Sequence, residues 1–137
     1  MDVQQVRKLD AYFKKLFGNA RIRVVPRPEK NDPAEVYIGA ERLGDLNMDD
    51  EDDDLSYNFR MEINLGEATP ADQIKRLEAY LKRKFDNEGI RVLPRARKTD
   101  SLEAYLGDEF IGVLFVDDEK GRRSFILEMP ILDMDLG

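Results

Sequence analysis

The chain is built from two similar halves that repeat with a period of 68 residues. Residues 6–63 align with residues 74–131 without a gap, and 25 of the 58 aligned pairs are identical. Internal repetition at a fixed spacing indicates that each copy folds as the same supersecondary unit. We therefore predict one fold used twice, in repeat one (residues 1–67) and in repeat two (residues 68–137).

Each repeat has the pattern of one helix followed by four strands. Apolar residues recur every three or four positions in 6–16 and 74–85, which is typical of an amphipathic helix. Segments 57–63 and 125–131 alternate apolar and polar residues, which is typical of a half-buried strand. These patterns predict a helix and a four-stranded meander in each repeat.

Glycine, asparagine and proline mark the expected ends of these elements. Gly18-Asn19 and Asn87-Glu88-Gly89 contain residues that tolerate positive φ, so they are expected to end the two helices. Pro26 and Pro94 close the first strand of each repeat, and they favour a sheet edge because proline has no N–H to donate. Tight hairpin turns are expected at 39–41 and 107–109.

We predict an α+β fold in which two αββββ repeats pack with pseudo-two-fold symmetry. Each repeat contributes one helix and antiparallel strands. A repeat of roughly 65 residues has a thin core, close to the lower limit for independent folding. The two repeats are therefore expected to share a boundary and form one compact body.

The sheet face opposite the helix distinguishes the two repeats. Alternate residues of a strand share a face, so three changes from polar to apolar fall on one surface. Repeat one presents Asp45, Asn47 and Asn58 there, and repeat two presents Val113, Phe115 and Ile126.

An apolar patch of this kind predicts either a binding surface or a surface that the chain itself covers. The C-terminal segment 130–136, rich in large apolar side chains, is the obvious cover. Our leading hypothesis is a non-enzymatic interaction module or small adaptor. It would bind an unidentified protein partner, or a second copy of itself, through Val113, Phe115 and Ile126.

Charge alternates along the chain although its net value is −7. Residues 1–30 and 68–98 carry +5 each, whereas 31–67 carry −10 and 99–137 carry −7. The alternative hypothesis is therefore nucleic-acid binding through the basic helix and first-strand faces. We favour a solvated basic face, because the chain is acidic overall and has no RNA-binding aromatic motif. The candidate residues are Arg23, Arg27, Lys30, Arg91, Arg95 and Lys98.

Several kinds of chemistry are disfavoured by composition. Cysteine and histidine are absent, which removes the thiolate nucleophile, the usual zinc ligands and the commonest general base. No glycine-rich phosphate-binding loop is present. The acidic run 49–54 lacks the EF-hand pattern and is interpreted as a solvated hairpin tip. We expect no catalytic residue, no metal site and no cofactor.

The sequence has the pattern of neither a signal peptide nor a membrane-spanning helix. The N-terminal sequence MDVQQVRKLD lacks the apolar core of a signal peptide. No apolar run approaches the ~20 residues that a membrane-spanning helix needs. We therefore expect a cytoplasmic protein without a membrane partner.

Three stretches carry a resemblance to a known family: MDVQQVRKLDAYFKKLFGN, IRVVPRPEKNDPAEVYIG and GDEFIGVLFVDDEKGRRSF. They resemble domain-of-unknown-function family 3126, whose members are small, mostly alphaproteobacterial proteins about one repeat long. The segment RLGDLNMDDEDDD of repeat one departs from the family pattern. The resemblance implies no activity. It implies that single-repeat relatives pair as homodimers and that this chain joins two such halves.

Overall fold

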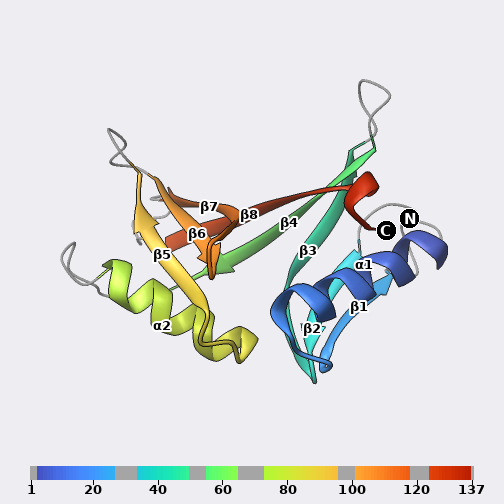
Figure 1. Ribbon diagram of the computed structural model, residues 1–137, viewed down its shortest axis with the longest axis horizontal. Helices are drawn as coiled ribbons and strands as arrows, with labels where there is room; N and C mark the ends of the chain where they lie inside the picture. Colours follow the sequence, from blue (N-terminus) through green and yellow to red (C-terminus); the bar gives the residue numbers. More distant parts are fainter. Residues whose placement is uncertain are drawn as a thin grey trace. The chain divides into compact units, whose positions relative to one another are not determined.

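The computed structural model describes residues 3–26, 34–49, 55–64, 73–95, 101–117 and 124–136 (Figure 1). In these residues each repeat contains one α-helix followed by four strands, as predicted. Repeat one comprises α1 (Val3–Phe17), β1 (Ile22–Pro26), β2 (Ala34–Ile38), β3 (Glu41–Asp49) and β4 (Ser56–Ile63). Repeat two comprises α2 (Gln73–Phe85), β5 (Ile90–Pro94), β6 (Ser101–Leu106), β7 (Glu109–Asp117) and β8 (Ser124–Leu132), followed by the 3₁₀ helix η3 (Asp133–Leu136).

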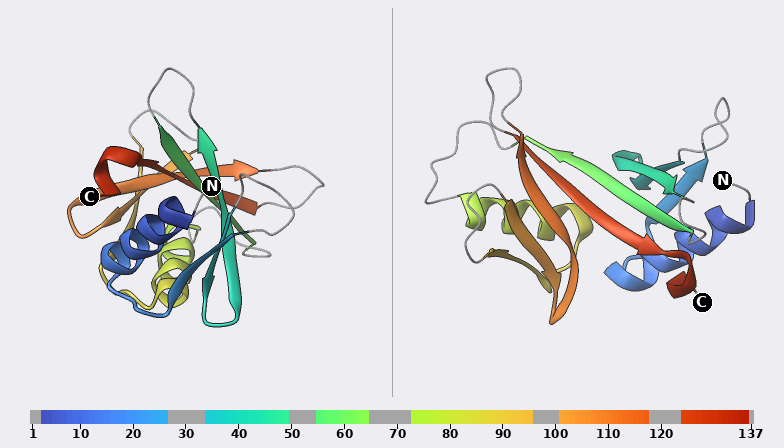
Figure 2. Two further views of the ribbon diagram at one scale, coloured as in Figure 1. Left: turned by 90° about the vertical axis from the view of Figure 1, so that its right-hand side faces the viewer. Right: turned by 90° about the horizontal axis from the view of Figure 1, so that it is seen from above.

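The strands belong to one eight-stranded sheet of order β1-β2-β3-β4-β8-β7-β6-β5. Consecutive strands within each repeat pair antiparallel. The last strands of the two repeats, β4 and β8, lie side by side in this order (Figure 2). The strands β1 and β5, which end at Pro26 and Pro94, form the two edges. The α+β class and the edge positions of the prolines are confirmed.

The chain divides into two compact units whose bounds differ from those of the repeats. Unit 1 contains Met1–Arg60 and Pro130–Gly137, and unit 2 contains Met61–Met129. Strands β4 and β8 are each divided between the two units. Residues 61–63 at the end of β4 belong to unit 2, and residues 130–132 at the end of β8 belong to unit 1. The pseudo-two-fold packing of the repeats stays a prediction.

Each unit buries the apolar face of its helix against its own strands. In unit 1 the Phe13 ring packs edge-on against the Phe59 ring, with centroids 5.3 Å apart, and both residues are fully buried. In unit 2 Leu77, Leu81 and Leu114 are at most 1% exposed. The alternation predicted for the last strand of each repeat is confirmed, because every second residue of β4 and β8 is apolar and buried. These residues are Tyr57, Phe59, Met61, Ile63, Phe125, Leu127, Met129 and Ile131.

Gly44 in β3 and Gly112 in β7 lie so close to the backbone of the neighbouring strand that no side chain fits at these positions. A Cβ atom on Gly44 would lie 2.3 Å from the carbonyl oxygen of Arg60, and one on Gly112 would lie 2.5 Å from that of Glu128. Real Cβ atoms do not approach a backbone oxygen so closely. The repeat of glycine at these two positions therefore follows from packing between β3 and β4, and between β7 and β8.

The predicted stop of the second helix was wrong by one residue. α1 ends at Phe17 and is followed by Gly18 with φ +60°, as expected, but the left-handed residue after α2 is Asp86, with φ 51°. Asp86 occupies the position that matches Gly18 in the repeat, and a short polar side chain tolerates this conformation. Asn87 instead stabilises the turn, because its Oδ1 accepts a 2.8 Å hydrogen bond from Gly89 N. The tight hairpin turns predicted at 39–41 and 107–109 are confirmed, and Gly39 and Gly107 adopt positive φ in them.

Candidate functional site

Strand pairing brings together the apolar residues that distinguish repeat two. Phe115 on β7 and Ile126 on β8 are direct cross-strand partners, and Val113 lies two residues along the same strand. The neighbours on the α2 side, Leu114 and Leu127, are buried, whereas Phe115 is 38% exposed. The three residues therefore share the face of the sheet opposite α2, as predicted from alternation. Their role in binding stays a prediction.

Phe110 extends this surface and was missed by the sequence prediction. It is 45% exposed, pairs with Tyr105 across the strands and packs edge-on against the Tyr105 ring at 5.7 Å. A signal for it exists in the repeat, because Phe110 stands where repeat one has Arg42. We call the set Phe110, Val113, Phe115 and Ile126 the unit 2 face.

The matching positions of unit 1 form a polar network. Arg42 makes an ion pair with Asp45 and lies 3.8 Å from a carboxylate oxygen of Glu35. Asp45 pairs across the strands with Arg60. Asn47 and Asn58 are also cross-strand partners. Each carboxylate of this network thus has an arginine of the same unit beside it.

The two carboxylates beside Val113 make no ion pair with a described residue. Glu103 and Glu128 flank Val113 as its cross-strand partners on either side. Glu128 stands where unit 1 has Arg60. Among the residues that the structure describes, neither glutamate makes an ion pair. The unit 2 face is therefore apolar at its centre and acidic at its flanks.

A tyrosine beside one of these glutamates repeats in both units. The Tyr105 hydroxyl donates to Glu103 at 3.2 Å, and the Tyr37 hydroxyl donates to Glu35 at 2.6 Å. The hydrogen bond to the glutamate raises the pKa of each phenol, because it stabilises the protonated form. Each phenol thus acts as a donor that holds the carboxylate in place.

The C-terminal 3₁₀ helix makes contacts within unit 1. Asp133 N donates to Leu55 O, and the Tyr57 hydroxyl donates to Asp133 Oδ1, both at 3.0 Å. η3 also contacts α1, so the segment is held within unit 1 (Figure 1). Phe110 and Phe115 remain exposed. The interpretation in which this segment buries the patch stays a prediction, and these contacts lend it no support.

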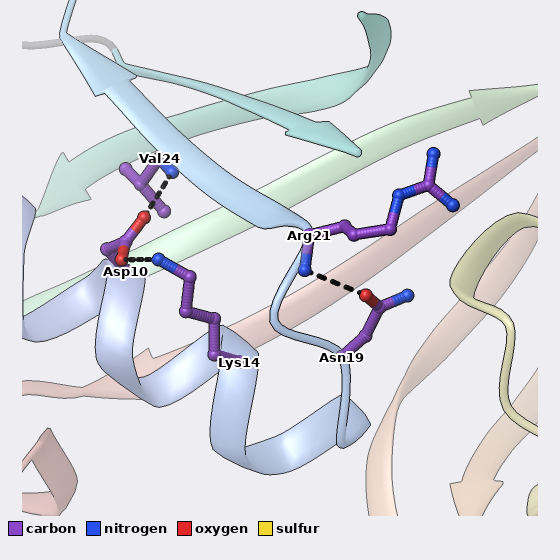
Figure 3. A network of polar contacts seen from close by, with 5 residues as sticks. All are labelled: Asp10, Lys14, Asn19, Arg21 and Val24. Atoms are coloured by element: carbon purple, nitrogen blue, oxygen red, sulfur yellow. Dashed lines mark hydrogen bonds and ion pairs between the residues drawn. The ribbon is translucent and has the colours of Figure 1, made fainter. Parts of the chain in front are cut away.

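The outer edge of β1 has few backbone donors left for another strand. Asp10 on α1 accepts hydrogen bonds from Lys14 and, at 2.9 Å, from Val24 N (Figure 3). Ile22 N donates to Asn19 O at 3.4 Å, and Pro26 has no N–H. These alternate residues are the ones whose N–H groups point away from β2. Strand addition at this edge is therefore disfavoured.

The same arrangement closes the edge at β5. Glu78 on α2 accepts a 3.0 Å hydrogen bond from Val92 N. It also forms an ion pair with Lys82, whose Nζ lies 3.2 Å from Glu78 Oε1. The bond from Val92 N, with a further contribution from Lys82, lowers the pKa of Glu78. Pro94 ends the strand without a donor. Both edges are thus protected by an acid on the helix and a proline on the strand.

The arginines predicted for nucleic-acid binding contact their own hairpins. Arg23 Nη2 donates to Gly39 O at 2.7 Å, and Arg91 Nη1 donates to Gly107 O at 3.4 Å. Arg95 Nη1 donates to Ser101 Oγ at 3.1 Å. Arg27, Lys30 and Lys98 lie outside the described residues.

The described residues hold no group of three or more acidic side chains arranged to bind a metal ion. Most of the acidic runs near residues 50–54 and 118–121 lie outside that part of the chain. No helix within the described ranges is long and apolar enough to cross a membrane.

Comparison with protein families gives one assignment for both repeats. Residues 5–65 and 73–135 each match the family described as "Protein of unknown function (DUF3126)". The chain belongs to this family. Two matches in one chain confirm the tandem duplication of the DUF3126 unit. No curated protein and no solved structure matches the chain.

Proposed function

We propose that this tandem DUF3126 protein is a non-enzymatic protein-interaction module that binds its partner on the unit 2 face. One observation carries the proposal: unit 2 exposes Phe110 and Phe115 at positions where unit 1, on the same strand scaffold, has polar residues. The fold does not need these aromatic residues on the outer face, since repeat one forms the same elements without them. Exposed aromatic side chains on a sheet are typical of a binding surface.

The charges around the face select the chemistry of the partner. Glu103 and Glu128 flank Val113, and neither makes an ion pair with a described residue. A two-fold contact between copies of the chain would bring like carboxylates together, which is unfavourable. A partner segment that combines aromatic or aliphatic residues with lysine or arginine would match both the apolar centre and the acidic flanks.

The closed sheet edges favour binding on the face over binding by strand addition. Adding a strand requires backbone donors and acceptors at an edge. At β1 and β5 the helix carboxylates of Asp10 and Glu78 already bind a backbone N–H. The unit 2 face instead exposes Phe110 and Phe115, which supports docking on the face.

The decisive experiment transfers the residues of repeat one to repeat two. The variant V113D/F115N/I126N carries side chains that the same positions already accommodate in repeat one. A random peptide library displayed on phage is selected against the wild-type chain. We expect enrichment of peptides with apolar and basic residues, and we expect these peptides to lose binding to the variant.

A matched control changes the polar face instead. The variant N47A/N58A alters the equivalent strands of unit 1 and should bind the selected peptides like the wild type. Sedimentation velocity tests the competing outcome, a second copy of the chain. Enrichment of acidic peptides, equal binding by V113D/F115N/I126N, or dimerisation that this variant abolishes would each contradict the proposal.

Nucleic-acid binding remains the alternative hypothesis. It rests on the basic residues of each helix and first strand, of which Arg23 and Arg91 already donate to their own hairpins. Titration of a labelled duplex at low and moderate salt tests it, because phosphate contacts give strongly salt-dependent affinity. Saturable binding that is lost in the variant R23Q/R91Q would favour this alternative.

A further inference from the structure

Glu35 in unit 1 has both a tyrosine and an arginine of its own unit beside its carboxylate. The Tyr37 hydroxyl donates to Glu35 Oε2 at 2.6 Å, and Arg42 Nε lies 3.8 Å from the same oxygen. Arg42 reaches Glu35 from the neighbouring strand, where it is the cross-strand partner of Tyr37. Unit 1 thus shows that this place in the fold accepts a guanidinium group beside a carboxylate that a phenol already binds.

Glu103, the equivalent residue of unit 2, keeps the tyrosine but has lost the arginine. The Tyr105 hydroxyl donates to Glu103 Oε2 at 3.2 Å, and Phe110 stands where unit 1 has Arg42. Within the described part of the chain, the Glu103 carboxylate accepts no hydrogen bond besides that of Tyr105. A carboxylate has about four acceptor sites, so Glu103 keeps the capacity to bind a cation.

Arg91, the basic cross-strand partner of Tyr105, is engaged at the hairpin instead. Its Nη1 donates to Gly107 O at 3.4 Å and lies 3.9 Å from Asp108 Oδ1. Both acceptors belong to the turn between β6 and β7. Arg91 therefore does not replace the cation that Arg42 supplies to Glu35 in unit 1.

The balance of charge on the outer face changes between the units. Four equivalent positions carry two acids and two arginines in unit 1, whereas in unit 2 they carry two glutamates and no basic residue. These positions are Glu35, Arg42, Asp45 and Arg60 in unit 1, and Glu103, Phe110, Val113 and Glu128 in unit 2. A cation from another molecule would restore in unit 2 the balance that unit 1 reaches internally.

The aromatic rings beside Glu103 favour arginine over lysine as the source of this cation. The Phe110 ring packs edge-on against the Tyr105 ring and is 45% exposed. A planar guanidinium group can pair with a carboxylate and also stack on an aromatic ring, whereas an ammonium group is a compact, strongly hydrated charge. Unit 1 contains such a stacking contact, since the Arg23 guanidinium group lies 5.5 Å from the centroid of the Tyr37 ring.

We propose that the unit 2 face recognises an arginine side chain of its partner, with the guanidinium group bound by Glu103 and stacked against Phe110. The inference rests on the proposed function, because it concerns the same face. It adds one residue type and one location to that function. Val113, Phe115 and Ile126 remain the surface for the apolar part of the partner.

The test uses three small peptides that differ in one side chain. They are acetyl-leucyl-arginine amide and its citrulline and lysine counterparts; citrulline has the shape of arginine without its charge. Each is titrated into the full chain at constant ionic strength, and the ring signals of Phe110 and Tyr105 are followed by NMR. We expect saturable shifts with a Kd of about 1 mM for the arginine peptide. Binding should be about fivefold weaker for citrulline and about threefold weaker for lysine.

Two substitutions in unit 2 and one matched control locate the site. Glu103→Gln should weaken binding of the arginine peptide about fivefold and leave the citrulline peptide unchanged, because only the charged peptide loses an ion pair. Phe110→Arg supplies the cation from within the chain, as repeat one does, and should weaken the arginine peptide about tenfold. Glu35→Gln, the equivalent change in unit 1, should leave both affinities unchanged. Thermal melts confirm that each variant is folded.

The outcomes separate this inference from the proposed function, because the phage selection uses different peptides. Equal binding of the arginine and citrulline peptides, or no saturation by the arginine peptide up to about 10 mM, would overturn the inference alone. Tighter binding of the lysine peptide would overturn the choice of arginine. Equal effects of Glu103→Gln and Glu35→Gln would overturn the location. Selected phage peptides that bind V113D/F115N/I126N like the wild type would overturn both proposals.

Discussion

On the outer side of unit 1, Arg42 lies beside Glu35 and Asp45, and Asn47 faces Asn58 across the strands. On the outer side of unit 2, the equivalents of Arg42, Asn47 and Asn58 are Phe110, Phe115 and Ile126. The inner sides, by contrast, are apolar in both units and pack against the helix in the same way. The comparison teaches that the inner face determines this fold, whereas the outer face is free to acquire a different role.

The largest effect is expected from a substitution on the inner face. Leu114→Ala removes a fully buried side chain and should lower the free energy of unfolding by about 3 kcal/mol, because it leaves a cavity. Its neighbour Phe115→Ala, on the outer face, should cost less than about 1 kcal/mol. Urea unfolding of both variants measures this difference. Equal losses would contradict the division into a structural and a functional face.

The second prediction converts the outer face of unit 1 into that of unit 2. The graft R42F/D45V/N47F/N58I/R60E places the residues of repeat two at the equivalent positions of repeat one. We expect the graft to double the number of selected peptides bound per chain, since both units then present an apolar centre flanked by carboxylates. Calorimetric titration gives the stoichiometry. An unchanged stoichiometry in a folded graft would show that these five positions are insufficient for binding.

The third prediction concerns the acid that protects the edge at β5. Glu78→Ala removes the acceptor of Val92 N and should lower the stability by about 1 kcal/mol, because the backbone donor loses its partner. Asp10→Ala is the matched change at the edge of β1. Both should also increase self-association, since a free edge favours strand pairing. Chemical unfolding and sedimentation velocity measure the two effects.

Glu78 also gives a pH dependence whose sign follows from its lowered pKa. Because folding lowers this pKa, the stabilisation is fully present above the unfolded value of about 4.3 and is lost as the pH falls through the folded value. Glu78→Gln keeps an acceptor oxygen for Val92 N but cannot titrate. Wild-type stability should therefore decrease more than that of the variant between neutral and acidic pH. Parallel pH profiles would contradict the assignment.

The smallest effect is expected at a buried amide. Gln5 Nε2 contacts Met48 Sδ at 3.6 Å. Its equivalent Gln73 is 8% exposed, and its Nε2 has no hydrogen-bond partner among the described residues. Val116 stands where repeat one has Met48. Val116→Met should restore a weak acceptor and raise the stability by about 0.5 kcal/mol. Thermal unfolding measures the change, and Met48→Val should act in the opposite direction.

Much of the site could be read from the differences between the two repeats. The alternation of apolar residues placed Val113, Phe115 and Ile126 on one face, which strand pairing confirms. The same comparison shows that Phe110 replaces Arg42 and that Glu128 replaces Arg60. The sequence prediction did not include these two positions, because it considered only the three positions at which a polar residue becomes apolar.

The sequence by itself determined the duplication, the order of helix and strands, the sheet edges at Pro26 and Pro94, and the sidedness of each strand. These follow from local rules, namely periodicity, backbone conformation and the missing N–H of proline. Only the tertiary structure decided that η3 packs on α1, that Asp10 and Glu78 close the edges, and that Phe110 and Phe115 stay exposed. Those facts depend on contacts between residues distant in the chain, where many partners are compatible with the same local pattern.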